Sequence, residues 1–468
     1  MRAWSKEKIS PLALVLLITG AIDSMRNLPG TALFGSRLIF FFIFAAVVFL
    51  IPVALIAAEL TATFPEEEGG IYSWVRHAFG PNVAFVAIWL QWINTVVWYP
   101  TILSFIAGTT AYLINPELAQ NKLYLIGIIL TVFWLLTWLG LSGIKTSATF
   151  ASLCTVLGMI LPMILIIMLA AMWIIGGHPS AIDLHWGNFL PTMDNQQSWI
   201  SLTAIMASFL GMELAAVHVR NVQHPQRNFP RSVLASAAII LITMIAGSLA
   251  IAIVLPVEQI NLVDGVMQAF TNFFQVYHLT SFVPMITILI LLGSLGGMVN
   301  WIISPAKGLL LAADHGFLPH WLYRLNHHGV PSRILIIQAI LVTVLCGGFL
   351  LFPSINAIYW LFTDLSTELY LLMYVLMFLA AWKLKTKFSY RQRHFKIVGG
   401  YIGYYLVCIL GLCGCITALI IGFIPPEHQH VTEHFRKIFA LGIIFMLLPL
   451  PVFFLHRKRA ILIDHQSL

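Results

Sequence analysis

Long runs of apolar residues, separated by short polar segments, fill the chain from one end to the other. A helix needs about 20 mostly apolar residues to cross the hydrocarbon core of a bilayer. Runs of this length predict twelve transmembrane helices, which we call spans 1 to 12. They cover about residues 10–34, 38–61, 83–114, 123–141, 147–175, 197–221, 231–256, 280–312, 333–352, 355–381, 400–424 and 436–456.

Composition excludes a soluble fold. Hydrophobic residues make up 60% of the 468 residues and charged residues 9%, whereas soluble domains have roughly 45–50% and about 25%. The basic start is followed by a long apolar run without a small-residue cleavage pattern. We therefore expect the first helix to stay in the membrane as an anchor.

The basic residues predict the orientation. If the N-terminus lies in the cytoplasm and the sides alternate, the outer side receives five cations, which leaves 20 of the 25 Lys and Arg residues inside. Cytoplasmic loops retain Lys and Arg, so the pattern predicts that both termini are cytoplasmic. The same bias accounts for the net charge of +7 without a nucleic-acid partner. The five outer cations are Arg26, Arg37, Lys122, Arg436 and Lys437.

Two spans contain a glycine next to an acidic residue. Span 1 holds Gly20 and Asp23, and span 6 holds Gly211 and Glu213. Ionisable groups inside a membrane are costly and usually functional, and transporters bind substrates at interrupted helices. The two positions are five spans apart, as a 5+5 inverted repeat requires. The alternative is that both glycines merely allow close helix packing, as the run from Gly293 to Gly297 would against span 1.

Several ordered motifs resemble a known family. The glycine of span 1 is followed by a proline-containing helix, an acidic Gly-Gly turn and a Phe-Gly-Pro end, and then by the span 6 glycine. The chain resembles the amino acid–polyamine–organocation superfamily, and within it the glutamate/γ-aminobutyrate antiporter family. The motifs are Thr19-Gly20-Ala21-Ile22, Ile51-Pro52-Val53-Ala54, Glu67-Glu68-Gly69-Gly70-Ile71-Tyr72, Phe79-Gly80-Pro81, Gly211-Met212-Glu213 and Pro305-Ala306-Lys307-Gly308.

The resemblance implies an all-α polytopic membrane protein of twelve transmembrane helices. It implies the leucine-transporter-type 5+5 inverted repeat with broken helices 1 and 6. One transporter domain would cover 1–468, with core helices at about 10–381 and two peripheral helices at about 400–456. The implied activity is exchange of one amino acid for a related amine or amino acid, by alternating access, across a bacterial inner membrane.

The resemblance also assigns a substrate site to the two breaks. The substrate carboxylate would meet backbone amides in the first break, and its amine would meet the backbone of the second break. The residues carried over are Gly20, Ala21, Ile22, Asp23 and Ser24 in span 1, and Phe209, Gly211 and Met212 in span 6.

The chain departs from the glutamate antiporters at three places. Their Tyr-Glu-Tyr-Pro run in span 1 reads Arg26-Asn27-Leu28-Pro29, and their glutamate in span 8 reads Gly297. Nine residues follow Arg459, where those antiporters have a long C-terminal plug. We therefore leave the carried amino acid or amine open and expect no acid gating by a plug.

Charged residues inside the spans are candidates for coupling and gating. Asp23 could bind a substrate ammonium or a proton, or could pair with Arg26 one helical turn away. Arg26 could attract anionic groups, or serve only that pair. Glu213 has no charged neighbour in its own helix before Arg220. It is therefore the stronger candidate for a proton-coupling group.

Further polar residues lie in spans 2, 3, 8 and 10. Asp364 and Glu368 share one face of span 10 and could shape the outer gate or the amine pocket. Glu59 is expected to bridge helix ends as a structural residue. The remaining candidates could line the pathway or only connect helices through hydrogen bonds. These are Trp301, Gln91, Asn94 and Trp98.

The sequence offers no pattern for catalysis. The histidines have irregular spacing and do not predict a metal site, and no phosphate-binding or hydrolase motif is present. We expect no cofactor and no enzymatic activity, and we expect all five cysteines to be buried apolar residues. The expected partners are small amino acids or amines, protons and the bilayer, with the oligomeric state open. A proton-coupled amino acid or cationic-amine permease is the alternative transporter, and a channel or receptor the alternative class.

Overall fold

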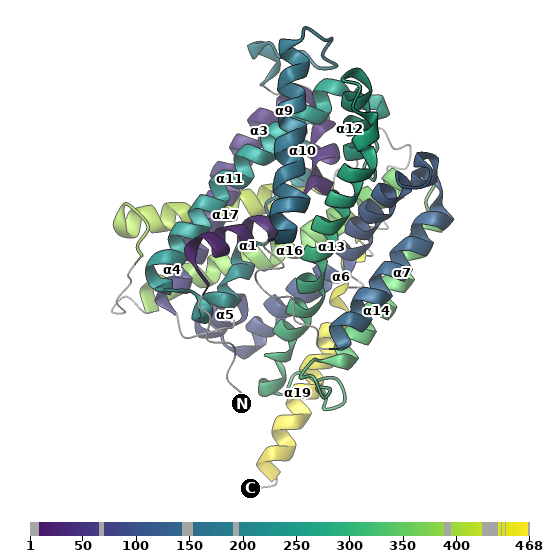
Figure 1. The fold of residues 1–468 in the computed structure, drawn as a ribbon. Helices are drawn as coiled ribbons and strands as arrows, with labels where there is room; N and C mark the ends of the chain where they lie inside the picture. Colours follow the sequence, from purple (N-terminus) through teal and green to yellow (C-terminus); the bar gives the residue numbers. More distant parts are fainter. Residues whose placement is uncertain are drawn as a thin grey trace.

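The computed structural model describes residues 9–64, 70–142, 153–190, 196–387, 395–423, 439–440, 442–444 and 446–466. Over these residues the chain is a helical bundle, and its only β pairing is an isolated bridge between Ile9 and Val222. The termini and the acidic part of the 65–69 turn lie outside the described residues. Figure 1 shows the helices packed along and across one another as a single bundle.

Most predicted spans correspond to α-helices. Their bounds are α1 Pro11–Ile22, α2 Leu28–Ala32, α3 Leu38–Ala45, α4 Ile51–Thr63, α5 Ile71–Phe79, α6 Pro81–Ala111, α7 Lys122–Leu141, α9 Leu161–Ile175, α10 Gln196–Ala207, α11 Pro225–Val254, α12 Gly265–Val276, α13 Val283–Leu310, α14 Ser332–Cys346, α15 Gly348–Leu351, α16 Ile355–Lys387, α17 Gly400–Ile421 and α19 Pro449–Gln466.

Ten helical segments of the described chain are long and apolar enough to cross a membrane. They match spans 1 to 5 and 7 to 11, so the all-helical membrane architecture is confirmed. Span 6 is represented only by a shorter apolar helical stretch, Leu202–Leu214, within which α10 ends at Ala207. Positions 436–438, 441 and 445 of span 12 lie outside the described residues. The number twelve therefore stays a prediction.

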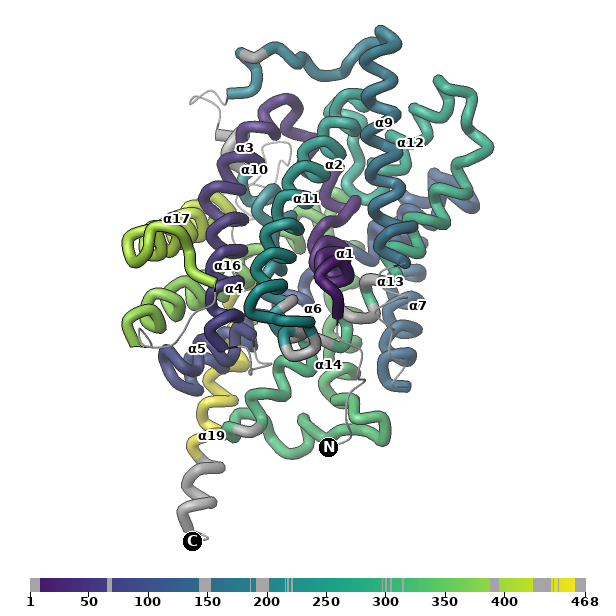
Figure 2. The backbone as a smooth tube through the Cα atoms, turned by 60° about the vertical axis from the view of Figure 1, so that its left-hand side comes forward, coloured from purple at the N-terminus to yellow at the C-terminus, as the bar shows by residue number. Residues whose placement is uncertain are grey.

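Helix α6 lies at the centre of the bundle. It packs against α5, α7, α13 and α16, and α16 packs in turn against α17. In Figure 2, α1 lies beside α11 and in front of α6, while α17 lies on one flank. Large apolar side chains such as Trp138 and Val344 are exposed on the outer helices. Such a surface suits lipid, and helices satisfy their own backbone hydrogen bonds there.

A buried ion pair fastens the ends of two helices. The Lys385 ammonium on α16 lies 2.7 Å from Oε1 of Glu59 on α4. The other carboxylate oxygen of Glu59 accepts a hydrogen bond of 2.9 Å from the Ile397 backbone N–H. The predicted bridging role of Glu59 is therefore confirmed.

Two packing predictions are wrong. Gly293 of α13 makes backbone contact with Gly158, and Gly296 packs against Cys154, so these small residues meet span 5 rather than span 1. Cys413 is exposed on α17, whereas the other four cysteines are buried. Both errors have one physical origin, because apolar composition does not tell which face of a membrane helix meets protein and which meets lipid.

Candidate functional site

Span 1 is interrupted in its middle. Helix α1 ends at Ile22, and Asp23 and Ser24 have extended backbone, with ψ angles of 118° and 122°. The chain resumes with a 3₁₀ turn over Met25–Asn27 and then α2. An extended residue cannot continue the i to i−4 ladder, so the interruption leaves backbone groups available at this level.

Span 6 is interrupted at Gly211. Helix α10 ends at Ala207, and a 3₁₀ helix covers Met212–Asn221 (η7). Gly211 has a φ of 109°, which disfavours any residue with a Cβ atom. Its N–H donates a 2.9 Å hydrogen bond to the Tyr374 hydroxyl. A glycine is thus required here for backbone conformation.

Gly20 has a different reason to be glycine. It lies inside α1, and a Cβ atom there would overlap the Thr155 side chain. The sequence left two explanations for these glycines, a helix break and close helix packing, and each explanation applies to one of the two positions. Gly20 allows close helix packing immediately before the first break, and Gly211 forms the second break.

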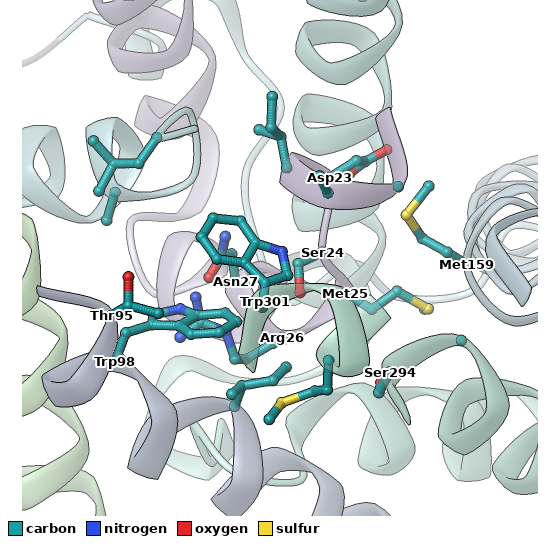
Figure 3. A pocket seen from close by; sticks show the side chains of 18 of the residues that line it. Asp23, Ser24, Met25, Arg26, Asn27, Thr95, Trp98, Met159, Ser294 and Trp301 are labelled. Atoms are coloured by element: carbon teal, nitrogen blue, oxygen red, sulfur yellow. The ribbon is translucent and has the colours of Figure 1, made fainter. Parts of the chain in front are cut away.

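A cavity of about 100 Å³ lies between the two interruptions (Figure 3). Its walls come from the span 1 break, from span 5 through Thr155, Gly158 and Met159, from α6, α13 and α16, and from the end of α10. Predicted site residues in the wall are Gly20, Ala21, Ile22, Asp23, Ser24, Arg26 and Trp301, together with Asn94 and Trp98.

Arg26 is buried among aromatic rings at the cavity. Its Nη1 donates to Thr101 Oγ1 at 2.8 Å and to the Tyr359 hydroxyl at 3.4 Å. The guanidinium carbon lies 5.3 Å from the centre of the Trp98 ring, and Trp98 lies 5.2 Å from Trp301. The buried Nε has no hydrogen-bond partner among the residues that the structure describes. Figure 3 shows Arg26 beside both indole rings.

Asp23 does not pair with Arg26. Its Oδ2 accepts a 2.8 Å hydrogen bond from Thr243 on α11, and its buried Oδ1 has no partner in the described part of the chain. In Figure 3 its carboxylate points away from Trp98 and Trp301. The pairing alternative assumed a continuous helix, but the extended backbone of Ser24 separates the two side chains. That alternative is wrong.

Glu213 lies outside the cavity wall and is fully surrounded by hydrogen-bond donors. The Tyr370 hydroxyl donates to Oε1 at 2.5 Å, Gln91 Nε2 donates to Oε1 at 3.2 Å, and the Tyr374 hydroxyl donates to Oε2. These donors come from α16 and α6. Because Tyr374 also accepts from Gly211, Glu213 and the span 6 break are held to one helix.

Five further predicted site residues do not line the cavity, namely Phe209, Gly211, Met212, Asp364 and Glu368. Phe209 packs against Phe42, with ring centres 5.6 Å apart, and Met212 is buried. Their segment reaches the cavity through Ala207 and Leu210 instead. Asp364 and Glu368 are buried on another face of α16.

The sequence reading missed the polar stripe that α16 presents to the cavity. Thr363, Ser366, Thr367 and Tyr370 line it, and they recur every three or four residues. That spacing places them on one helix face. A search for polar residues at helical spacing inside an apolar span would have found this stripe.

A helical membrane bundle in which two interrupted helices surround a small, partly polar cavity has the architecture of a solute transporter. A family model described as amino acid permease matches residues 9–448. The chain belongs to this family, within the amino acid–polyamine–organocation superfamily, and is an integral membrane protein.

Three relatives cover nearly the whole chain. A protein named as an uncharacterized transporter of Legionella pneumophila is 43% identical over 448 residues, or 95% of this chain and 96% of the relative. A glutamate/gamma-aminobutyrate antiporter of Lactococcus lactis is 30% identical, over 97% of this chain and 92% of its own. A probable agmatine/putrescine antiporter of the same species is 24% identical, over 91% and 90%.

Proposed function

We propose that the protein is a secondary amino acid antiporter that binds its substrate in this cavity and works by alternating access. The observation that carries the proposal is the position of the cavity, which lies between the breaks of spans 1 and 6. Interrupted helices offer backbone groups to a zwitterion, and rearrangement of such helices can open the site to either side.

The groups around the cavity suggest how a substrate would be oriented. The substrate carboxylate meets the non-helical backbone at Asp23 and Ser24 and the guanidinium of Arg26. The amine meets the backbone of the segment from Phe209 to Met212. Trp98 and Trp301 form an aromatic wall against the rest of the substrate. The Tyr99 hydroxyl donates a 2.7 Å hydrogen bond to the backbone carbonyl of Trp301 and holds this residue in place.

A proton-coupled permease is the second candidate, and Glu213 favours it. Tyr370 lines the cavity and donates to Glu213, so one hydroxyl connects the substrate space to a buried carboxylate. A change in the protonation of Glu213 would alter the bonds that hold Gly211 and α16 together. Asp364 and Glu368 would act from outside the cavity as gating groups.

We propose the twelve-span, 5+5 arrangement with both termini in the cytoplasm of a bacterium. The uneven distribution of Lys and Arg supports the orientation. The two breaks, five spans apart, support the repeat. The core helices would then lie at about 10–381 within one domain, with peripheral helices at about 400–456.

A counterflow screen in proteoliposomes tests the function. Liposomes are loaded with one unlabelled amino acid or amine, and uptake of labelled amino acids is followed. Because two relatives are named as antiporters of amino acids or amines, the screen includes both. We expect uptake that is stimulated by internal substrate. A proton gradient that drives uptake into empty liposomes would favour the permease. Ion conductance far above carrier turnover would contradict both.

A further inference from the structure

Helix α16 carries a pair of carboxylic residues outside the substrate cavity. Asp364 and Glu368 are 4% and 0% exposed. Four residues apart in a helix, they lie one above the other on the same face. The cavity-lining residues Thr363, Thr367 and Tyr370 lie about a third of the way round the same helix. One helix therefore presents a substrate wall on one face and two carboxyl groups on another.

Neither carboxyl group has a partner among the residues that the structure describes. Both oxygens of Glu368 are completely buried and make no hydrogen bond to a described residue. Within the same residues, no hydrogen bond or ion pair involves Asp364. A buried carboxylate without hydrogen bonds or a counter-charge is strongly disfavoured, and a second carboxylate one turn away adds repulsion.

Glu368 also faces the wrong end of a neighbouring helix for an anion. Helix α17 ends at Ile421, and a Cβ atom added to Gly422 would overlap Glu368 Oε1. The Gly422 N–H closes the last turn on the Ala418 carbonyl at 2.8 Å. The free carbonyl groups of a helix C-terminus carry partial negative charge. They repel a carboxylate but attract the O–H of a carboxylic acid.

The helices packed on α16 bring no cation to this pair within the described chain. Helices α6, α10, α15 and α17 contain no acidic or basic side chain. Glu59 of α4 pairs with Lys385, and the His77 carbonyl of α5 accepts a hydrogen bond from Lys387. Helix α5 also carries Arg76. Lys385 is about 25 Å along the helix from Glu368. The remaining titratable groups on α16 and α17 are Lys383, Tyr359, Tyr370, Tyr374, Tyr401, Tyr404, Tyr405, Cys408, Cys413 and Cys415.

We propose that Asp364 and Glu368 form a proton-binding site that is separate from the substrate cavity. The pair holds at least one proton while α16 packs against the end of α17. Release of this proton places negative charge against the carbonyl end of α17 and pushes the two helices apart. Its effect on transport rests on the proposed antiport function, because α16 also forms the cavity wall, but the binding of the proton does not.

The binding test uses the purified protein in detergent. Infrared spectra record the carbonyl stretch of protonated carboxyl groups, and thermal unfolding is followed from about pH 5 to about pH 8. The variants are Glu368→Gln, Asp364→Asn and the double variant, with Glu117→Gln as the exposed control. We expect the carboxylic-acid band to change in intensity or in frequency in both single variants, because each variant removes one of the two carboxyl groups that hold the proton. We also expect the melting temperature of the wild type to fall with rising pH relative to the double variant.

Two outcomes would overturn the site. The first is an unchanged carboxylic-acid band in both single variants, which can be read even if the double variant fails to fold. The second is stabilisation by sodium at alkaline pH that is present in the wild type and absent in Glu368→Gln, because this would assign the pair to a metal cation.

Transport then separates this site from the proposed function. If the proteoliposomes exchange amino acids, we expect Glu368→Gln to retain exchange and lose part of its pH dependence. An unaltered pH profile would remove the coupling of the site to transport. Absence of exchange in the wild type, with the carboxylic-acid band intact, would contradict the antiport proposal alone.

Discussion

Among the residues that the structure describes, Arg26 is the one cation in the wall of the cavity, and its side chain is held in place by Thr101, Tyr359 and Trp98. A fixed guanidinium loses little freedom when it binds a carboxylate, and no described residue accepts a hydrogen bond from its Nε. This combination makes Arg26 the side chain that we expect to contribute most to the binding of a substrate carboxylate.

Replacing Arg26 should therefore weaken substrate binding. Arg26→Ala removes a charge-assisted hydrogen bond worth about 1.5–3 kcal/mol, so the apparent affinity should fall at least about tenfold. Arg26→Lys keeps the positive charge but not the planar guanidinium group. Its apparent affinity should lie between those of the wild type and Arg26→Ala. Exchange kinetics in proteoliposomes give the affinities. Arg333→Ala, which loses an exposed contact with the Trp321 carbonyl, is the control. Equal affinities for Arg26→Ala and Arg333→Ala would exclude this role.

Tyr374 is the residue that ties the span 6 break to α16. Tyr374→Phe leaves the buried Gly211 N–H without an acceptor and removes one donor from Glu213. We expect a loss of about 2–4 kcal/mol in stability, together with slower exchange. Tyr404→Phe is the matched control, because its buried hydroxyl donates to the Ala381 carbonyl, within a regular helix rather than at a break. Thermal unfolding compares the two variants, and equal melting temperatures would argue against the tether.

At the scale of elements, the break in span 6 depends on one left-handed residue. Gly211→Ala forces a Cβ atom into a positive-φ conformation, at a cost of about 1–2 kcal/mol. We expect lower thermal stability and reduced exchange. Gly127→Ala on α7 is the control, because no atom lies within 4 Å of the added carbon and alanine favours a helix. A Gly211→Ala protein as stable and active as Gly127→Ala would show that the break does not need this conformation.

The segment between α11 and α12 packs against the half of span 1 that follows the break. Gly265 packs on Pro29, Val263 packs on Gly108, and the Leu262 N–H donates to Asn356 at 3.2 Å. Asp264 in this segment accepts a 2.9 Å hydrogen bond from Tyr112, but its other oxygen is buried and has no partner among the described residues. Burial raises the pKa of Asp264 from 3.8 to about 6, although the Tyr112 hydrogen bond acts in the opposite direction.

This pKa predicts a pH-dependent contribution to stability. The folded protein binds the Asp264 proton more tightly than the unfolded chain does between about pH 4 and about pH 6. Stability should therefore fall by up to about 3 kcal/mol as pH rises through this window and level off above it. Asp264→Asn should lack this part of the fall. Melting curves of both proteins against pH provide the test, and parallel curves would contradict the prediction.

The sequence predicted the elements better than the contacts between them. Length and hydropathy locate ten spans, because a membrane helix must be long and apolar whatever its neighbours are. The break at Gly211 could be predicted because a glycine next to an acidic residue in an apolar span is visible in the local sequence. The partners of Glu213 come from α6 and α16, more than a hundred residues away along the chain, and no local pattern reports them. The supposed pairing of Asp23 with Arg26 failed because the break itself invalidates helical spacing.

At the scale of the whole molecule, the two discontinuous spans meet span 5 and helices α6, α13 and α16 around one small space. Most predicted span 1 residues lie in its wall, whereas Phe209, Gly211 and Met212 do not line it and would contribute through backbone groups. The role of each residue in binding stays a prediction. The arrangement places a cation, non-helical backbone and aromatic rings where a zwitterion needs them, with the α16 carboxyl pair outside.

Substrate protection of a single cysteine in the cavity tests the central claim most directly. Ser294→Cys, in a chain whose five cysteines are replaced, places a thiol in the cavity wall, and Ser180→Cys places one in an exposed loop. At about ten times its dissociation constant, an amino acid that the protein exchanges should slow labelling of Ser294→Cys about tenfold. It should leave labelling of Ser180→Cys unchanged. Labelling of Ser294→Cys at the same rate with and without such a substrate would show that the cavity is not the transport site.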